Sequence, residues 1–414
     1  MQLSSTLLFV AKVTFLFRLP NSKHLKSEFF YLFSMIFLPK VFCVLCFFST
    51  FAVMKLHIFN PEHDLALAAN LRQFTAPHAG QQLRADLSFI PALWAEEGDF
   101  VLVDDIDDAR DKVRHLGSKY VDKVEFITRL QLQKVFTDTF LVDSVHPWGW
   151  DPAVREELKR MGCPDIMLPN KENIQSIRAL SSRQWAAAHL QRGVEYVESV
   201  GEVRRLVAEW GRAVVKAPWS SSGRGVKFIS VDNYRGEDVE FTSFDRWVGN
   251  IIGRQGGVTV EPYYNKVKDF GMEFEVRDGK VLYRGLSLFQ TVKNAYTGNL
   301  LASEDMKMEL MAPYVSAEQL AEIRDRLMGT LEPHLKDIYQ GPFGVDMMVC
   351  AGADDELFVN PCIELNLRRT MGHVALALGD AALDRPRIMR VDFDGNRYHL
   401  RVMPGKPSED APLH

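Results

Sequence analysis

The chain has 414 residues, of which 47% are hydrophobic and 25% charged, and its formal net charge is −5. This composition is typical of a soluble globular protein, and it excludes collagen-like, coiled-coil, mucin-like and wholly disordered classes. The weakly acidic balance gives no electrostatic reason to expect a nucleic-acid partner. The five cysteines are too few and too scattered for a disulfide framework.

Residues 1–53 differ in composition from the rest of the chain. They hold eleven of the 27 phenylalanines and five Lys or Arg against one acidic residue, a net charge of +4, so the remainder carries −9. The apolar runs Phe29–Leu38 and Val41–Val53 are each shorter than the roughly 20 residues that span a bilayer. We expect a translated extension before a true start at Met54, with a cytoplasmic protein following. A membrane anchor and a signal peptide are the alternatives.

The body begins with a pattern of alternating strands and helices, which predicts a parallel sheet with helices on both faces. This first α/β domain is expected over residues 54–169. A connecting loop is expected over Val142–Asp151. The domain is expected to end in a turn-rich stretch over Pro147–Pro169. The predicted strands are Lys55–Phe59, Phe100–Asp104 and Val124–Thr128. The predicted helices are Gly80–Glu97 and Arg129–Asp138.

From Asn170 the pattern changes to helices mixed with strands and hairpins. The dipeptides Asp278-Gly279 and Asp394-Gly395 favour tight hairpin turns. The predicted helices are Lys171–Leu180, Ser182–Gln191, Gly201–Trp210, Ser243–Gly253 and Ser316–Tyr339. The predicted strands are Val194–Val197, Ala213–Ala217, Gly225–Ser230, Val258–Tyr263, Asp269–Arg277, Lys280–Gln290, Phe343–Cys350, Glu356–Arg368, Ile388–Phe393 and Arg397–Val402. The polar tail, residues 404–414, is expected to be disordered.

A candidate phosphate-binding segment follows the strand that ends at Lys216. The next residues form a loop rich in small side chains: Ser220, Ser221, Ser222, Gly223, Arg224 and Gly225. Backbone N–H groups of such a loop can approach phosphate oxygens closely. The order of residues is not that of a Walker A motif. The alternative is a flexible surface hairpin with an incidental lysine.

Two further segments place polar groups on strands. Glu261 ends a strand beside Pro262, where its carboxylate could bind a ribose or an amino group or lie in solvent. Glu364, Asn366 and Arg368 alternate along a strand that otherwise reads as buried, so they share one face. With Asp346 on the preceding strand they form a set of oxygen ligands that suits Mg²⁺. A structural salt-bridge network, such as Glu364 with Arg368, is the alternative.

Together these three segments resemble the ATP-grasp superfamily, from about Asn170 to Arg369. The resemblance implies an N-terminal α/β domain, a small lid subdomain (170–265) and a C-terminal subdomain (266–403) that binds nucleotide and metal. It implies that Lys216 and the loop through Gly225 bind phosphates and that Glu261 binds adenosine. It also implies that Asp346, Glu364 and Asn366 bind one or two Mg²⁺ ions, while Arg368 stabilises the transferred phosphoryl group.

One position departs from the family's pattern. A lysine often found on the helix before the lid is replaced here, in the sequence Ser181-Ser182-Arg183, by Arg183. Arginine keeps the positive charge but changes its geometry. We therefore expect Arg183 to contact the nucleotide in place of the lysine.

The implied reaction activates a carboxylate with ATP as an acyl-phosphate, which an amine then attacks. The expected partners are small-molecule carboxylate and amine substrates, with a homodimer as a further expectation. A kinase-like phosphotransferase and a nucleotide-binding module without turnover are the alternatives. The identity of the substrates is not evident from the sequence.

Polar residues after the first strand are candidates for substrate binding. In open α/β sheets, ligands bind at the carboxyl ends of the strands. The alternative for Asp64 is a helix N-cap. The candidate substrate-binding residues are Asn60, Glu62, His63, Asp64, His78 and Arg369.

Overall fold

The computed structural model describes residues 54–138, 142–220, 225–234, 242–292, 295–352, 354–379 and 385–405. Residues from Met54 onward form one compact unit, and residues 1–53 lie outside the described residues. The predictions for 1–53 and for most of the tail therefore fall outside the description, although the last strand reaches Pro404. No helix in the described part is long and apolar enough to cross a bilayer.

The first sheet is parallel, with strand order β3-β2-β1-β4. Its strands are β1 (Met54–Ile58), β2 (Phe100–Leu102), β3 (Glu125–Ile127) and β4 (Val142–Pro147). The expectation of a loop over Val142–Asp151 is wrong for Val142–Pro147, because β4 pairs with the open edge of β1 and buries Val142 and Val145; residues 148–151 are irregular, as expected. The helices of this part are α3 (His63–Ala69), α4 (His78–Leu87), α5 (Ile106–Leu116), α6 (Ser118–Val121), α7 (Arg129–Asp138) and α8 (Pro152–Arg160).

Two helical predictions in this part need correction. The helix expected over Gly80–Glu97 ends at Leu87, and a short 3-10 helix, η1 (Ile90–Leu93), follows. Pro91 explains the break, since its ring would clash with the carbonyl four residues earlier, that of Leu87. Helix α8 lies where only turns were expected. Its signals were Asp151, whose side chain caps the helix, and Pro152 in the first turn.

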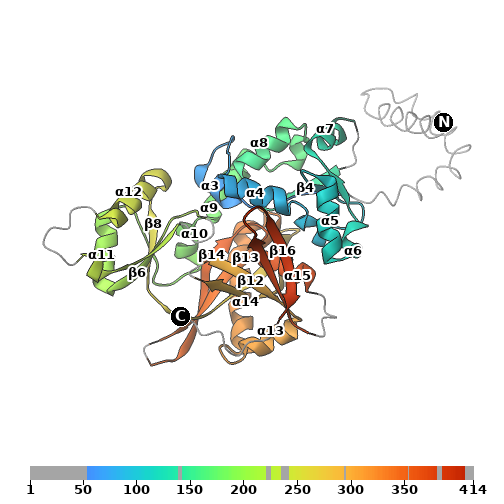
Figure 1. The fold of residues 1–414 in the computed structure, drawn as a ribbon. Helices are drawn as coiled ribbons and strands as arrows, with labels where there is room; N and C mark the ends of the chain where they lie inside the picture. The colour runs from blue at the N-terminus through green and yellow to red at the C-terminus, as the bar shows by residue number, and fades with distance from the viewer. Residues whose placement is uncertain are drawn as a thin grey trace, which may run out of the picture. The chain divides into compact units, whose positions relative to one another are not determined.

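The second sheet is antiparallel, with order β5-β8-β6-β7. Helices α11 and α12 cover one face of this sheet (Figure 1), where Val203, Val215 and Val260 share a core. The elements are η2 (Asp165–Met167), α9 (Lys171–Leu180), α10 (Arg183–His189), β5 (Glu195–Val197), α11 (Val200–Trp210), β6 (Arg212–Lys216), β7 (Val226–Ser230), η3 (Val231–Tyr234), α12 (Ser243–Gln255) and β8 (Val258–Pro262).

The third sheet, β10-β9-β13-β14, is antiparallel and contains the largest core, built around Phe270, Phe274 and Phe343. Asp278 and Gly279 both have positive φ at the turn between β9 and β10, as expected for this hairpin. Helix α14 packs against β9 and β10. The elements are β9 (Asn265–Arg277), β10 (Lys280–Ser287), α13 (Glu304–Met311), α14 (Ala317–Leu335), β13 (Gly341–Ala351) and β14 (Leu357–Asn366).

The fourth sheet, β11-β12-β15-β16, is also antiparallel. The single strand expected over Lys280–Gln290 is wrong, because the chain leaves the third sheet after Ser287 and enters the fourth at Phe289. The elements are β11 (Phe289–Val292), β12 (Ala295–Leu301), α15 (Met371–Leu378), β15 (Arg387–Phe393) and β16 (Tyr398–Pro404). The fold class is confirmed: a parallel α/β sheet precedes antiparallel sheets. The internal domain boundaries stay a prediction.

Candidate functional site

The second sheet places Lys216 and Glu261 side by side on the face opposite α11 and α12. Ala213 and Val215 pack into the core beneath α11 and α12, so Val214 and Lys216 point the other way. Glu261 of β8 lies opposite Val214 in the register. The Lys216 Nζ lies 2.6 Å from Glu261 Oε1, with 8% and 6% of the two side chains exposed. The two residues assigned to the nucleotide thus form a buried ion pair.

Phe228, which the sequence analysis did not single out, belongs to the same face. It lies opposite Val214 on β7, and 50% of its surface is exposed. Its ring meets that of Tyr263 edge to face, with 5.9 Å between the centroids. The alternation of side chains along β7 could have identified Phe228. Ile229 is buried in the core, so its neighbour Phe228 must point to the opposite face. This face therefore combines an apolar surface with a buried ion pair.

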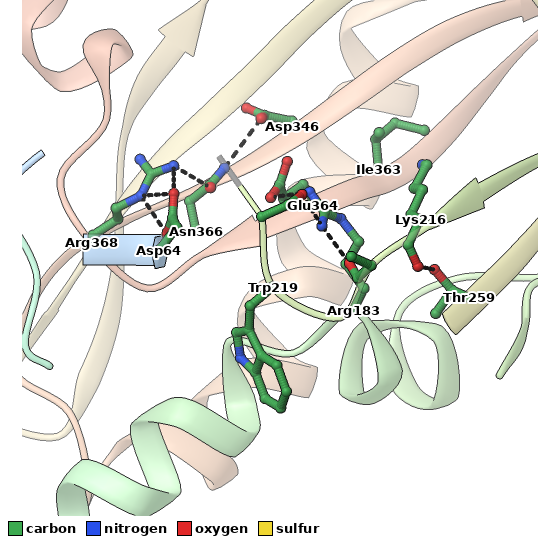
Figure 2. Close-up of polar contacts among 12 residues, drawn as sticks. Asp64, Arg183, Lys216, Trp219, Thr259, Asp346, Ile363, Glu364, Asn366 and Arg368 are labelled. Carbon is green, nitrogen blue, oxygen red and sulfur yellow. Dashed lines mark hydrogen bonds and ion pairs between the residues drawn. The ribbon is translucent and has the colours of Figure 1, made fainter. Parts of the chain in front are cut away.

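Arg183 connects the loop after β6 with the third sheet. It is the first residue of α10 and is 6% exposed. One guanidinium nitrogen donates to the carbonyl of Ala217 (2.6 Å) and to Ser220 Oγ (2.8 Å), and the other donates to Glu364 Oε1 (2.6 Å). Figure 2 shows Arg183 beside Glu364. The arginine therefore holds both predicted halves of the site.

The loop that carries the small residues closes tightly at its two ends. The amide of Ala217 donates to the carbonyl of Gly225 at 2.8 Å. A Cβ on Gly225 would lie 2.6 Å from Ser220 Oγ, too close for any side chain at this position. Ser221, Ser222, Gly223 and Arg224 lie outside the described residues, so their predicted phosphate contacts stay predictions.

Asp346 and Glu364 face each other across β13 and β14. Burial, followed by the nearby charges of Glu364 and Glu273, raises the pKa of Asp346 to about 8. Asn366 Nδ2 donates to Asp346 Oδ2 at 3.1 Å, while Asn366 Oδ1 accepts from Arg368 at 2.9 Å. Asn366 thus orients Asp346 and Arg368, and its oxygen is already engaged by the arginine.

Arg368 forms an ion pair with Asp64, from the start of α3. Its Nε and Nη2 donate to the Asp64 carboxylate at 2.9 to 3.1 Å (Figure 2). Burial opposes both charges, yet the pKa of Asp64 is lowered by Arg368 and the pKa of Arg368 is raised by Asp64. Helix α3 begins at His63 and is flanked by Glu62, so the N-cap alternative for Asp64 is wrong. Asp64 instead joins helix α3 to the segment just after β14.

Glu273 lies buried beside this cluster and was not identified from the sequence. It is 2% exposed, accepts from Thr370 Oγ1 at 2.8 Å and lies 2.9 Å from His373 Nδ1. Gly344 and Gly372 leave the space that its carboxylate fills. Thr370 and His373 form the capping box of α15, so His373 caps the start of that helix.

The other candidate substrate residues are not part of this cluster. Asn60 donates to the Gly149 carbonyl and to Asp151. Glu62 pairs with Arg84, and His63 is fully buried, with Asp151 3.6 Å away. His78 is exposed at the start of α4. Arg369 lies over the Trp94 ring at 4.1 Å, and burial lowers its pKa to about 10.

Asp346 and Glu364 offer oxygen ligands of the kind that Mg²⁺ prefers. Among the described residues, no group of three or more His, Cys, Asp or Glu side chains is arranged to hold a metal ion alone. Two opposed carboxylates that disfavour each other's ionisation nevertheless suit a divalent cation, and Mg²⁺ commonly binds one or two carboxylates together with substrate phosphates. Asp346 and Glu364 therefore fit a metal that a nucleotide would help to hold.

Comparisons with known proteins give structural likeness at low identity. No family model matches the chain, and no curated protein matches it. N5-carboxyaminoimidazole synthetase from Staphylococcus aureus, complexed with ADP, is 13% identical with a TM-score of 0.45, covering 83% of each chain. Biotin carboxylase from Campylobacter jejuni, as a β-γ-ATP complex, is 13% identical with a TM-score of 0.44, covering 83% of this chain and 76% of that one.

A third similar structure is the biotin carboxylase domain of Hydrogenobacter thermophilus 2-oxoglutarate carboxylase, complexed with MgADP, ADP and bicarbonate. It is 14% identical with a TM-score of 0.44, covering 81% of this chain and 74% of that chain.

Proposed function

We propose that this protein is an ATP-dependent ligase of the ATP-grasp type, which activates a carboxylate for attack by an amine. The observation that carries the proposal is the position of Arg183. Arg183 donates hydrogen bonds to the segment after Lys216, which the sequence predicts to bind phosphate. It also donates to Glu364, which the sequence predicts to bind metal. Cationic and anionic groups from three distant segments thus meet at one place, as a magnesium nucleotide requires.

The face of the second sheet opposite α11 and α12 suits a nucleoside at its exposed part, near Phe228. Phe228 offers an exposed apolar surface for a base, and Glu261 lies in the same row of the sheet as a hydrogen-bond acceptor. Lys216 lies one row further, toward the loop, where its ammonium would meet phosphates. In this proposal the Lys216–Glu261 contact opens so that the lysine binds phosphate oxygens.

The third sheet supplies the charges for phosphoryl transfer. Asp346 and Glu364 would hold Mg²⁺, which neutralises negative charge on the phosphates when bound. Arg368, fixed by Asp64 and Asn366, would stabilise the phosphoryl group as a substrate carboxylate oxygen bonds to phosphorus and ADP leaves. An amine then forms the C–N bond, phosphate leaves the carbonyl carbon, and the amine proton passes to solvent.

The test is an ADP-release assay on the full chain with Mg²⁺, ATP and a matrix of carboxylic acids and amines. A ligase releases phosphate only when both substrates are present. A phosphotransferase would form ADP and a stable phosphorylated product without an amine. ATP binding with no ADP release under any combination would contradict the ligase proposal and favour the non-catalytic module.

A further inference from the structure

A hollow lies beside β14, the last strand in the order of the third sheet. Helix α10 packs against β14 (Figure 1), and α14 packs against β9 and β10 of the same sheet. The end of α10, the segment between β8 and β9, the middle of α14 and β14 surround the hollow. Its volume is about 400 Å³, within the range of roughly 300 to 1,000 Å³ that small-molecule sites occupy.

The lining of this hollow carries positive charge without negative charge. Arg192 and Arg326 belong to the lining, and none of the described residues in it is Asp or Glu. Both arginines are exposed, and neither forms a hydrogen bond or ion pair with another described residue. A guanidinium presents its N–H donors in a fixed fork that suits the oxygens of a carboxylate or a phosphate. The hollow therefore favours an anion.

Apolar and aromatic side chains form much of the remaining lining. Leu190 and Leu327 are buried, whereas 39% of the Phe358 surface is exposed. The Phe358 ring meets the ring of Tyr264 edge to face, with 6.0 Å between the centroids. Aromatic rings pack well against such surfaces in edge-to-face or offset arrangements. The anion that fits this hollow therefore carries a ring.

Asn360 adds a polar group that a ligand can reach. The residue is 7% exposed, and its side-chain amide has no hydrogen-bond partner within the part of the chain that the structure describes. Neither amide atom is among the fully enclosed polar atoms, so both stay accessible from the hollow. A few polar groups in a mostly apolar pocket fix the orientation of a ligand.

We propose that this hollow binds a small aromatic oxyanion, an aromatic ring that carries a carboxylate or a phosphate. The ring would pack against Phe358 and Tyr264, and the oxyanion would accept hydrogen bonds from Arg192 and Arg326. None of the residues assigned above to nucleotide or metal lines the hollow. The site does not depend on the proposed ligase activity, and it binds its ligand without ATP.

The test is a ligand-observed NMR titration of the full chain, without ATP, with phenyl phosphate and 3-phenylpropanoate. Inorganic phosphate and acetate supply the charge alone, and 3-phenylpropanamide supplies the ring without the charge. At least one aromatic oxyanion binds about tenfold more tightly than any probe with a single function. Preference for phenyl phosphate assigns the site to phosphate esters, and preference for 3-phenylpropanoate assigns it to carboxylates.

Matched variants at exposed positions test the two parts of the site. Phe358→Ala weakens binding about tenfold, whereas Leu357→Ala leaves it unchanged, because Leu357 is 40% exposed but lies outside the lining. Arg192→Gln and Arg326→Gln each weaken binding about tenfold. Arg110→Gln, at an exposed position of α5, is the matched control and leaves binding unchanged. Urea unfolding checks that each variant is folded.

Three results would overturn the inference. The aromatic oxyanions bind no more tightly than the single-function probes, or Phe358→Ala binds them as well as the native chain does. In the third, ATP displaces a bound probe competitively, which would make the hollow part of the nucleotide site. Glu364→Gln, which is expected to lose ADP formation, leaves probe binding unchanged, so this site and the ligase proposal can fail separately.

Discussion

Arg183 donates to Glu364 Oε1 at 2.6 Å, although 181 residues separate the two in the chain. The same guanidinium holds Ala217 and Ser220, at the start of the proposed phosphate loop. A bound nucleotide would compete for these bonds or use them. The carboxylate of Glu364 is thus a point at which Arg183 links the third sheet to the loop that follows β6 of the second sheet.

Replacing Glu364 with Gln is expected to abolish ADP formation while the protein stays folded. The amide keeps an acceptor for Arg183 but removes a charge that the metal needs. ADP release and the urea unfolding curve are measured together. Glu322→Gln, on an exposed position of α14, is the matched control and should retain full turnover. Native turnover in Glu364→Gln would show that the metal assignment is wrong.

Replacing Lys216 with Ala is expected to weaken both ATP binding and folding. The change leaves Glu261 as an unpaired buried carboxylate, which typically costs about 3 kcal/mol of unfolding free energy. The double variant Lys216→Met, Glu261→Met removes both charges and should recover most of the stability without recovering ATP affinity. Titration calorimetry and urea unfolding separate the two effects. Native ATP affinity in the double variant would remove Lys216 from the site.

Gly225→Ala is expected to weaken nucleotide binding more than it weakens the fold. The new methyl group would collide with Ser220, which Arg183 holds in place, so the loop cannot close as it does now. Gly253→Ala on α12 is the matched control. Its Cβ would meet nothing within 4 Å, and alanine favours the helix. Equal ATP affinities in the two variants would argue against the loop's role.

Asp64→Asn is expected to reduce turnover about tenfold or more with ATP affinity nearly unchanged. The amide cannot hold both guanidinium nitrogens of Arg368 as an ionised carboxylate does, so the arginine loses its fixed position. Steady-state rates and ATP binding are compared in the same preparation. A loss of ATP affinity without a loss of rate would assign Asp64 and Arg368 to nucleotide binding instead.

His146 is expected to make the fold sensitive to acid. Burial lowers its folded-state pKa from 6.5 to about 4, with His57 adding to the shift, so the unfolded chain binds the extra proton first. Its contribution to stability is complete above about pH 6.5 and is lost as pH falls toward about 4. Urea unfolding at several pH values checks this. His146→Gln should flatten the dependence, and an unchanged slope would contradict the assignment.

Sequence reasoning worked best where a signal was local. The Asp278-Gly279 turn and the helix over Arg129–Asp138 appear as predicted. The lysine-tipped strand and the acidic strand pair also appear, because strand periodicity and turn residues are short-range properties. In each of these turns, helices and strands, neighbouring residues alone determine which way the side chains point.

The errors and omissions depend on distant partners. Strand β4 was missed because its reason to be extended is the open edge of β1, about 90 residues earlier. The break between β10 and β11 arises because β10 pairs within the third sheet and β11 within the fourth, and these pairing partners lie elsewhere in the chain. The Asp64–Arg368 pair spans 304 residues, and Glu273 became visible only through Thr370 and His373. Such contacts leave no periodic trace in the sequence.

The central claim is that Lys216 and the Asp346–Glu364 pair bind one magnesium nucleotide. Its most direct test is a crystal structure of the full chain with Mg²⁺ and the non-hydrolysable analogue β,γ-imido-ATP. We predict phosphate oxygens in contact with Lys216 and a metal ion shared between those phosphates and the two carboxylates. A nucleotide bound elsewhere, touching neither Lys216 nor the carboxylates, would contradict the account.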